Sequence, residues 1–241
     1  VCIGGAKSSE SYLNIPAIIT AAEMTGCDAI FPGYGFLSEN QDFVEICRLH
    51  NIKFIGPSVE VMEKMADKSK AKEEMIRAGV PVVPGSKGSV HSVTEGKKVA
   101  LEIGYPIMAK AAAGGGGRGM RLIKEESEFD QLFMAASSEA LAAFGDGTMY
   151  LERFINNPRH IEVQVVGDSH GNAIHIGERD CSLQRRHQKV IEESPAILLN
   201  DETRANLHDV AVRATKYLKY EGAGTFEFLA DDKQNIYFME M

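Results

Sequence analysis

The first part of the chain alternates short apolar runs with segments in which apolar residues recur every three or four positions. A helix is predicted after Asn14 and ends at Gly26, and a second helix is predicted after Asn40. Short buried strands are predicted over residues 28–31 and 53–55. Because strands and helices alternate, this part of the chain predicts a parallel sheet.

The middle of the chain predicts helices that flank a pair of strands. Residues 58–78 are predicted to be helical, and residues 80–85 form a hinge-like stretch after Gly79. Ser92 and Glu95 have the spacing of a capping box, which marks the start of a helix. That helix is predicted to end at Gly104, followed by strands over 105–109 and 120–123, a helix over about 125–143 and a strand over 149–155.

After residue 158 polar and apolar residues alternate over longer strands, which is typical of an antiparallel sheet. The elements predicted here are strands over 159–167, 172–179 and 188–193, a helix over 201–220 and a final hairpin over 224–230 and 235–240. The expected fold class is therefore α/β with α+β character, in which a parallel sheet precedes an antiparallel one.

Lys110 ends the strand that precedes a glycine loop at positions 114–119, where five of six residues are glycine. Backbone N–H groups of such a loop can bind phosphate oxygens. The loop satisfies the spacing of a dinucleotide fingerprint, but a strand rather than a helix follows it. It lacks the Gly-Lys-Ser/Thr ending of a P-loop, and a protein-kinase loop has its lysine downstream. A phosphate-binding hairpin is predicted, with a flexible surface hairpin as the alternative.

Two further patterns place polar side chains on strands. His160, Glu162 and Gln164 alternate with apolar residues and therefore share one face, which also suits a face exposed to water. A symmetric register across the last hairpin pairs residue 231 with 236, and hence Glu227 with Glu240. Carboxylates that lie opposite each other repel unless they share a cation, so a divalent metal site is predicted. The alternative is that one of them faces solvent.

A cluster of cations extends from Arg179 to Lys189 and contains four basic residues and one histidine. Such a run is also common on solvated surfaces. Close to a phosphate loop, it predicts a site for a nucleotide or a small oxyanion.

The composition excludes several classes of protein. The 26 Lys and Arg against 34 Asp and Glu give a net charge of −8, which disfavours nucleic-acid binding. Four cysteines without metal-site spacing, and no signal peptide, indicate reduced thiols in a cytoplasmic protein. No apolar run has the 18 or so residues that a membrane span needs.

Several motifs together resemble the biotin carboxylases, and most closely the biotin carboxylase subunit of bacterial acetyl-CoA carboxylase. They are Pro-Gly-Tyr-Gly-Phe-Leu-Ser-Glu-Asn at 32–40, Lys110 with the glycine loop, Pro-Arg-His-Ile-Glu-Val-Gln at 158–164, Glu-Arg-Asp-Cys-Ser-Leu-Gln-Arg-Arg-His-Gln-Lys at 178–189 and Gly-Thr-Phe-Glu-Phe at 224–228. The resemblance covers essentially the whole chain and implies an ATP-grasp fold preceded by part of a Rossmann-like domain. The implied division is an N-terminal domain over 1–66, a helical linker over 67–84, a lid over 85–150 and the first part of the ATP-grasp C-terminal subdomain over 151–241.

The resemblance also implies roles for individual residues. Lys189 would hold bicarbonate, and Glu227 and Glu240 would bind magnesium or manganese. The residues implied to contact ATP are Lys68, Lys110, Gly116, Gly117, Glu152, Arg153, Phe154, Ile155, His160, Gln184 and His187. Phe31 stands where many members of the family have a histidine, and the sequence does not indicate what this difference changes.

The implied activity is ATP-dependent carboxylation of carrier-bound biotin with bicarbonate, through carboxyphosphate. The implied partners are a biotin carboxyl carrier protein and carboxyltransferase subunits, and a homodimer is expected for the full-length protein. The alternatives are a biotin carboxylase of another acyl-CoA or pyruvate carboxylase, a different ATP-grasp ligase, and a nucleotide-binding module without catalysis.

The chain starts at Val1 and stops at Met241 within a strand-like run, so a fragment is expected. In the resembling family the catalytic arginine follows the position of Glu240. The chain made alone is therefore expected to be inactive.

Overall fold

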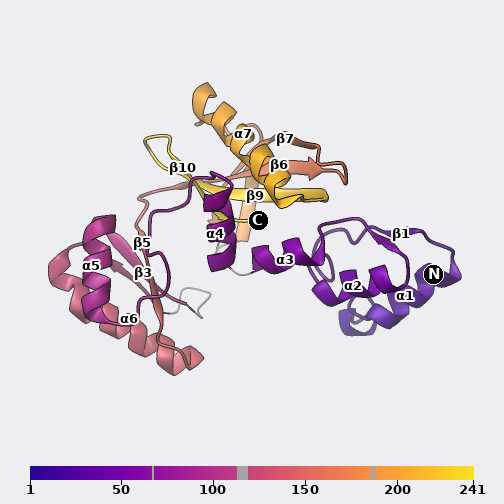
Figure 1. Cartoon of the computed structure of the whole chain (residues 1–241), viewed down its shortest axis with the longest axis horizontal. Helices are drawn as coiled ribbons and strands as arrows, with labels where there is room; N and C mark the ends of the chain where they lie inside the picture. Colours follow the sequence, from indigo (N-terminus) through magenta and orange to yellow (C-terminus); the bar gives the residue numbers. More distant parts are fainter. Residues whose placement is uncertain (67, 113–118, 186–187) are drawn as a thin grey trace. The chain divides into compact units, whose positions relative to one another are not determined.

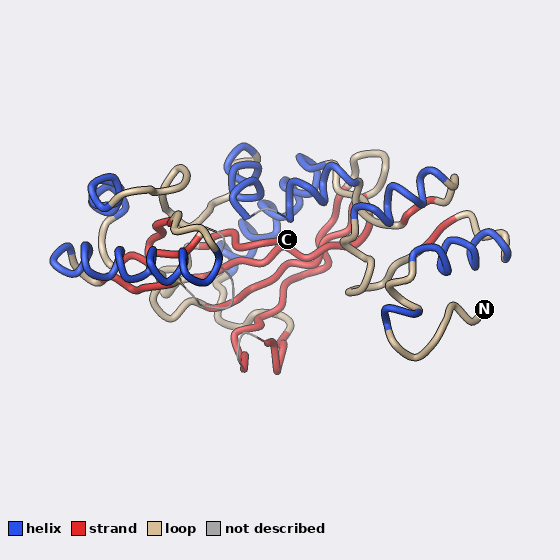
Figure 2. The backbone as a smooth tube through the Cα atoms, turned by 90° about the horizontal axis from the view of Figure 1, so that it is seen from below, coloured by secondary structure: helices blue, strands red, loops and turns tan. Residues whose placement is uncertain are grey.

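The computed structural model describes residues 1–66, 68–112, 119–185 and 188–241 (Figure 1). These residues form two compact units. The first contains residues 1–81, 159–230 and 234–241, and the second contains residues 82–158 and 231–233. Figure 2 shows helices and strands mixed along the chain, in agreement with the expected fold class.

The first unit begins with the predicted parallel pair of strands. β1 (Ala29–Ile30) and β2 (Lys53–Phe54) pair in parallel and are joined through α2 (Gln41–Leu49), with α1 (Ile15–Met24) before them and a 3-10 turn at Ser8–Glu10. The Asn14 side chain accepts a hydrogen bond from the backbone N–H of Ala17, and Asn40 accepts one from Phe43. Both asparagines are therefore helix caps, as predicted.

The stretch predicted to be helical over residues 58–78 contains two described helices. α3 (Val59–Ala66) and α4 (Lys68–Arg77) flank position 67, which lies outside the described residues. α4 packs against the last strand of the sheet described next and against α3. The Tyr217 hydroxyl donates to Glu74 Oε2 at 3.2 Å, which ties α4 to the helix that covers that sheet.

A five-stranded antiparallel sheet is the largest element of the first unit. Its order is β10-β9-β6-β7-β8, with β6 (Arg159–Gly167) in the centre, β7 (Ala173–Arg185) and β8 (Gln188–Glu193) on one side, and β9 (Gly222–Ala230) and β10 (Ile236–Glu240) on the other. α7 (Asp201–Leu218) packs against β6 and β7. One face of β6 and β9 carries buried apolar side chains, among them Ile161, Val163, Phe226 and Phe228.

The second unit is a three-stranded sheet with two helices. Its antiparallel order is β4-β3-β5, made of β3 (Ile107–Ala111), β4 (Met120–Ile123) and β5 (Met149–Arg153), packed with α5 (Val93–Ile103) and α6 (Phe129–Phe144), which follows a 3-10 turn at Glu126–Glu128. The core includes Ile107, Phe129 and Leu151, which are fully buried. One half of the predicted capping box is present, since the backbone N–H of Glu95 donates to Ser92 Oγ at 3.2 Å, while the Glu95 side chain accepts from the N–H of His91 and not of Ser92.

The strands on either side of the glycine loop pair as a hairpin, as predicted, with Lys110 opposite Met120. Gly119, which returns the chain to the sheet, has φ of +66°, and a Cβ there would lie 2.8 Å from the Cβ of Ala111. Only glycine fits this position without displacing its neighbour. Loop residues 113–118 lie outside the described part of the structure.

Among the described helices, none combines the length and the apolar character that crossing a bilayer would need.

Candidate functional site

Polar side chains gather on one face of the central strand β6, as the alternation of residues predicts. Glu162 lies opposite Glu227 of β9 and opposite Arg179 of β7 in the two ladders. His160 and Gln164 stand on the same face, because His160 bonds to Glu227 and the Gln164 side-chain oxygen accepts from Arg179 Nη1 at 3.2 Å. The alternative interpretation, in which this face is exposed to water, is wrong for Glu162, because that residue is only 3% exposed.

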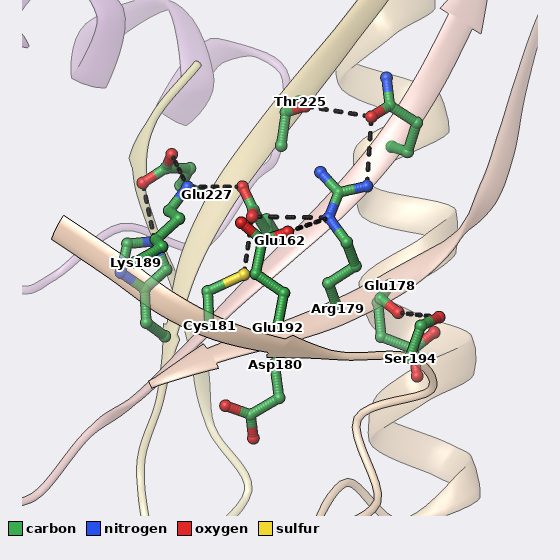
Figure 3. A network of polar contacts seen from close by, with 12 residues as sticks. Glu162, Glu178, Arg179, Asp180, Cys181, Lys189, Glu192, Ser194, Thr225 and Glu227 are labelled. Carbon is green, nitrogen blue, oxygen red and sulfur yellow. Dashed lines mark hydrogen bonds and ion pairs between the residues drawn. The ribbon is translucent and has the colours of Figure 1, made fainter. Parts of the chain in front are cut away.

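Lys189 lies between two of these carboxylates (Figure 3). Its Nζ donates to Glu162 Oε2 at 2.8 Å and to Glu227 Oε1 at 2.7 Å. Burial opposes the charge of the ammonium group, but the two carboxylates outweigh it and raise the pKa of Lys189. An ammonium group has three donors, so the bonds to Glu162 and Glu227 leave a third N–H for another acceptor.

Glu227 is held from its other oxygen by His160. The distance from His160 Nε2 to Glu227 Oε2 is 2.7 Å, and Gln184 Nε2 lies 2.7 Å from His160 Nδ1. Because Gln184 Nε2 also donates to the carbonyl oxygen of Cys181, this amide nitrogen is a donor to Nδ1, and Nε2 of His160 carries the proton given to Glu227. Burial works against the charge of Glu227, yet the His160 and Lys189 hydrogen bonds lower its pKa to about 2.

Glu162 is the most buried carboxylate of the cluster, and its central place was not predicted. Its Oε1 accepts from Cys181 Sγ at 2.7 Å, while Lys189 bonds to its other oxygen. Burial and the adjacent carboxylate raise the pKa of Cys181 to about 12, so the thiol keeps its proton. The alternation on β6 indicated the face of Glu162, but nothing in the sequence indicated that Cys181 of β7 shares it.

The predicted pairing of Glu227 with Glu240 is present, but the register that led to it is wrong. Ile236 pairs with residue 230 rather than 231, so a regular ladder would place residue 239 opposite Glu227. A bulge between Phe238 and Glu240 adds one residue to β10 and returns Glu240 to the position opposite Glu227. Cross-strand partners lie on the same face, so the two carboxylates are neighbours.

The second unit contains a separate cluster built on Lys110. Its Nζ lies 2.5 Å from Glu152 Oε2, which joins the lysine before the glycine loop to a residue of β5. Arg153 Nη2 donates to the carbonyl oxygen of Ile103, and the N–H of Phe154 donates to that of Pro106. These bonds fix the backbone where β5 leads into the segment at 152–155 that the resemblance implies to contact ATP.

The remaining predicted residues are only partly described. Gln184 lies on β7 beside His160, and Ile155 follows β5 and is half-buried. Lys68 is the first residue of α4, and its side chain lies outside what the structure describes, as do Gly116, Gly117 and His187.

Two family descriptions together match nearly the whole chain. Residues 67–241 match "Carbamoyl-phosphate synthase L chain, ATP binding domain", and residues 1–62 match "Biotin carboxylase, N-terminal domain". With the antiparallel sheets described above, these matches define a protein of the ATP-grasp class that is preceded by a parallel-sheet domain.

Individual relatives agree with this class. The biotin carboxylase of a Nostoc strain is 56% identical over all of this chain and 54% of its own length. A crystal structure of a biotin carboxylase complex with beta-gamma-ATP from Campylobacter jejuni is 68% identical, with a TM-score of 0.83, and covers 100% of this chain and 54% of that one. The biotin carboxylase domain dimer of Hydrogenobacter thermophilus 2-oxoglutarate carboxylase, solved with MgADP, ADP and bicarbonate, is 51% identical, with a TM-score of 0.79, over 98% of this chain and 52% of that one. The chain belongs to the biotin carboxylase family and spans about half the length of these relatives.

Proposed function

We propose that this chain is the ATP-binding part of a ligase that carboxylates carrier-bound biotin with ATP and bicarbonate. The observation that carries the proposal is the Lys189 ammonium group, held by Glu162 and Glu227 at 2.8 and 2.7 Å, with no acceptor for its third N–H among the described residues. A fixed cation that keeps one donor available suits a small oxyanion, and the Hydrogenobacter relative was solved with bicarbonate.

In the proposed reaction, a bicarbonate oxygen attacks the γ-phosphorus of ATP, the bond to the β-phosphate oxygen breaks, and ADP leaves. The carboxyphosphate that forms breaks into carbon dioxide and phosphate, the phosphate takes the proton from N1 of biotin, and N1 then bonds to the carbon of the carbon dioxide. Phosphoryl transfer needs positioning and charge neutralisation more than covalent chemistry. Lys189 would hold bicarbonate, and the residues proposed for ATP are Lys68, Lys110, Gly116, Gly117, Glu152–Ile155, His160, Gln184 and His187.

Magnesium fits the donors that face each other on β9 and β10. Glu227 and Glu240 offer carboxylate oxygens, which are the ligands this ion prefers, and they are direct cross-strand partners. Each Glu227 oxygen accepts one hydrogen bond and retains a further lone pair. When bound there, magnesium would neutralise charge on the ATP phosphates.

The finer proposal is that the reaction is the first half-reaction of acetyl-CoA carboxylase, in fatty acid synthesis, with a biotin carboxyl carrier protein and carboxyltransferase subunits as partners. A homodimer and a cytoplasmic location are proposed for the full-length protein. The 2-oxoglutarate carboxylase relative favours a second candidate, in which the carboxyl group goes to a keto acid instead.

The test is phosphate release by the full-length protein that contains this chain. We expect release to require both bicarbonate and biotin, and labelled bicarbonate to appear in carboxybiotin. Carboxyl transfer to acetyl-CoA, pyruvate or 2-oxoglutarate, measured with the cognate carboxyltransferase, then separates the candidates. ATP hydrolysis that ignores biotin and bicarbonate but responds to another acceptor would contradict the proposal.

A further inference from the structure

Arg179 of β7 stands beside the Lys189 cluster without touching Lys189. It pairs with Glu162 in the ladder, and its Nε lies 3.5 Å from Glu162 Oε1. The same Nε lies 3.5 Å from Glu192 Oε2 on β8, and Nη1 donates to Gln164 Oε1. Figure 3 shows the guanidinium group beside Glu162, on the side away from Lys189.

Arg179 halves the excess of negative charge around Lys189. Glu162 and Glu192 have carboxylate oxygens within 4.8 Å of each other, and Glu227 adds a third carboxylate through Lys189. Lys189 and Arg179 are the two cations that contact these groups in the described part of the chain. Without Arg179, three carboxylates would share one ammonium group.

The burial of Glu162 makes the charge of Arg179 important. Its side chain is 4% exposed, so solvent cannot screen its charge, and a buried carboxylate needs a cation or hydrogen bonds. Lys189 and Cys181 supply two hydrogen bonds, and Arg179 supplies a second positive charge. An anion that approaches Lys189 would otherwise meet the excess negative charge of Glu162 and Glu192.

We propose that Arg179 is a positioning residue for the bicarbonate step, because its charge offsets part of the negative charge of Glu162 and Glu192 and so leaves more of the charge of Lys189 available to the anion. The inference rests on the proposed function. Arg179 acts through Glu162 and is not itself a contact of bicarbonate. Its contacts are to Gln164, Glu162 and Glu192, and Glu162 bonds directly to Lys189, so its effect should be larger on bicarbonate than on ATP.

The first test is Arg179→Gln in the full-length protein. We expect the KM for bicarbonate to rise about tenfold, as one unbalanced charge near the site would produce, while the KM for ATP stays within about twofold. Arg179→Lys keeps the charge, so its KM for bicarbonate should stay within about threefold of wild type. Adding Glu192→Gln to Arg179→Gln removes a surplus carboxylate and should recover most of the loss, and this cycle isolates the charge effect.

The matched control is Arg204→Gln. Arg204 also binds a buried glutamate of β7, since its Nε donates to Glu178 Oε1 at 2.9 Å, but Glu178 faces α7 and not Lys189. Arg204→Gln should lower stability and leave the KM for bicarbonate unchanged.

The inference is overturned if Arg179→Gln raises both KM values equally, or matches Arg204→Gln, or if Arg179→Lys loses as much as Arg179→Gln. If Arg179→Gln does not fold, the KM values of Arg179→Lys and of the double variant test the inference, with the same expected changes as given above. A wild-type protein without bicarbonate-dependent turnover would instead defeat the proposed function, and the inference with it.

Discussion

Glu227 and Glu240 lie directly opposite each other on β9 and β10 only because of a bulge in β10. The turn of this hairpin is one residue longer than a symmetric four-residue turn, since Ile236 pairs with Ala230. The extra residue of the bulge cancels that shift. The result is a pair of facing carboxylates, which repel each other unless a cation lies between them.

This pairing predicts that magnesium dependence is lost when Glu240 is changed. In the full-length protein, Glu240→Gln should weaken nucleotide binding at saturating magnesium by about tenfold, because one hard ligand is lost. It should change binding little when magnesium is removed. The measurement is ATP affinity by calorimetry with and without magnesium. Asp232→Asn, which makes the same charge change on the turn of the same hairpin, is the control, and an equal effect of both variants would argue against a shared ion.

The two lysine clusters predict separable kinetic defects. Lys110→Ala should raise the KM for ATP, because Lys110 adjoins the glycine loop. Lys189→Gln should abolish bicarbonate-dependent turnover while nucleotide binding survives, with a loss of at least about a hundredfold. Steady-state kinetics with each substrate varied in turn, together with direct ATP binding, distinguish the two. The opposite assignment of defects would show that the roles are exchanged.

Glu178 predicts a dependence of stability on pH. Burial opposes its charge, but hydrogen bonds from Arg204, His208 and the N–H of Ala196 hold the pKa of this carboxyl below its usual value. A carboxyl whose folded pKa is depressed contributes stability above its unfolded pKa, and that contribution is lost as pH falls through the folded value. Glu178→Gln should therefore cost about 3 kcal/mol near pH 7, and less at pH 4. Urea unfolding of both proteins across this range is the measurement, and a difference that is constant with pH would rule out the linkage.

Replacing Gly222 by alanine should disturb packing in addition to straining the backbone. Its φ is +86°, and a Cβ there would lie 3.0 Å from the Cα of Gly56. Gly222→Ala should therefore destabilise the first unit by about 2–4 kcal/mol. Gly171 isolates the strain, because its φ is +84° and a Cβ added there would meet no atom within 4 Å. Gly171→Ala should cost only about 1–2 kcal/mol. Equal unfolding midpoints for the two variants would mean that the close approach to Gly56 does not add to the destabilisation.

Local patterns predicted most of the elements, because caps and periodicity act over a few residues. The Ser92 cap, the hairpin around the glycine loop and the polar face of β6 all follow from neighbouring residues. The register of the strands and the side-chain contacts between strands did not follow from neighbouring residues. The bulge before Glu240 depends on the whole ladder, and the proximity of Arg179 to Glu192 depends on how β8 pairs with β7. The cations near Lys189 were expected to bind an anion, but the structure shows that they first balance buried carboxylates.

The most direct test of the proposed reaction follows an oxygen atom from bicarbonate into the released phosphate. If bicarbonate attacks the γ-phosphorus in the site built on Lys189, full-length protein supplied with ¹⁸O-labelled bicarbonate and biotin should release phosphate that carries one labelled oxygen per turnover. Lys189→Gln should release none above background. Mass spectrometry of the phosphate measures this. Unlabelled phosphate from an active wild-type protein would mean that water, and not bicarbonate, accepts the phosphoryl group, and would contradict the account.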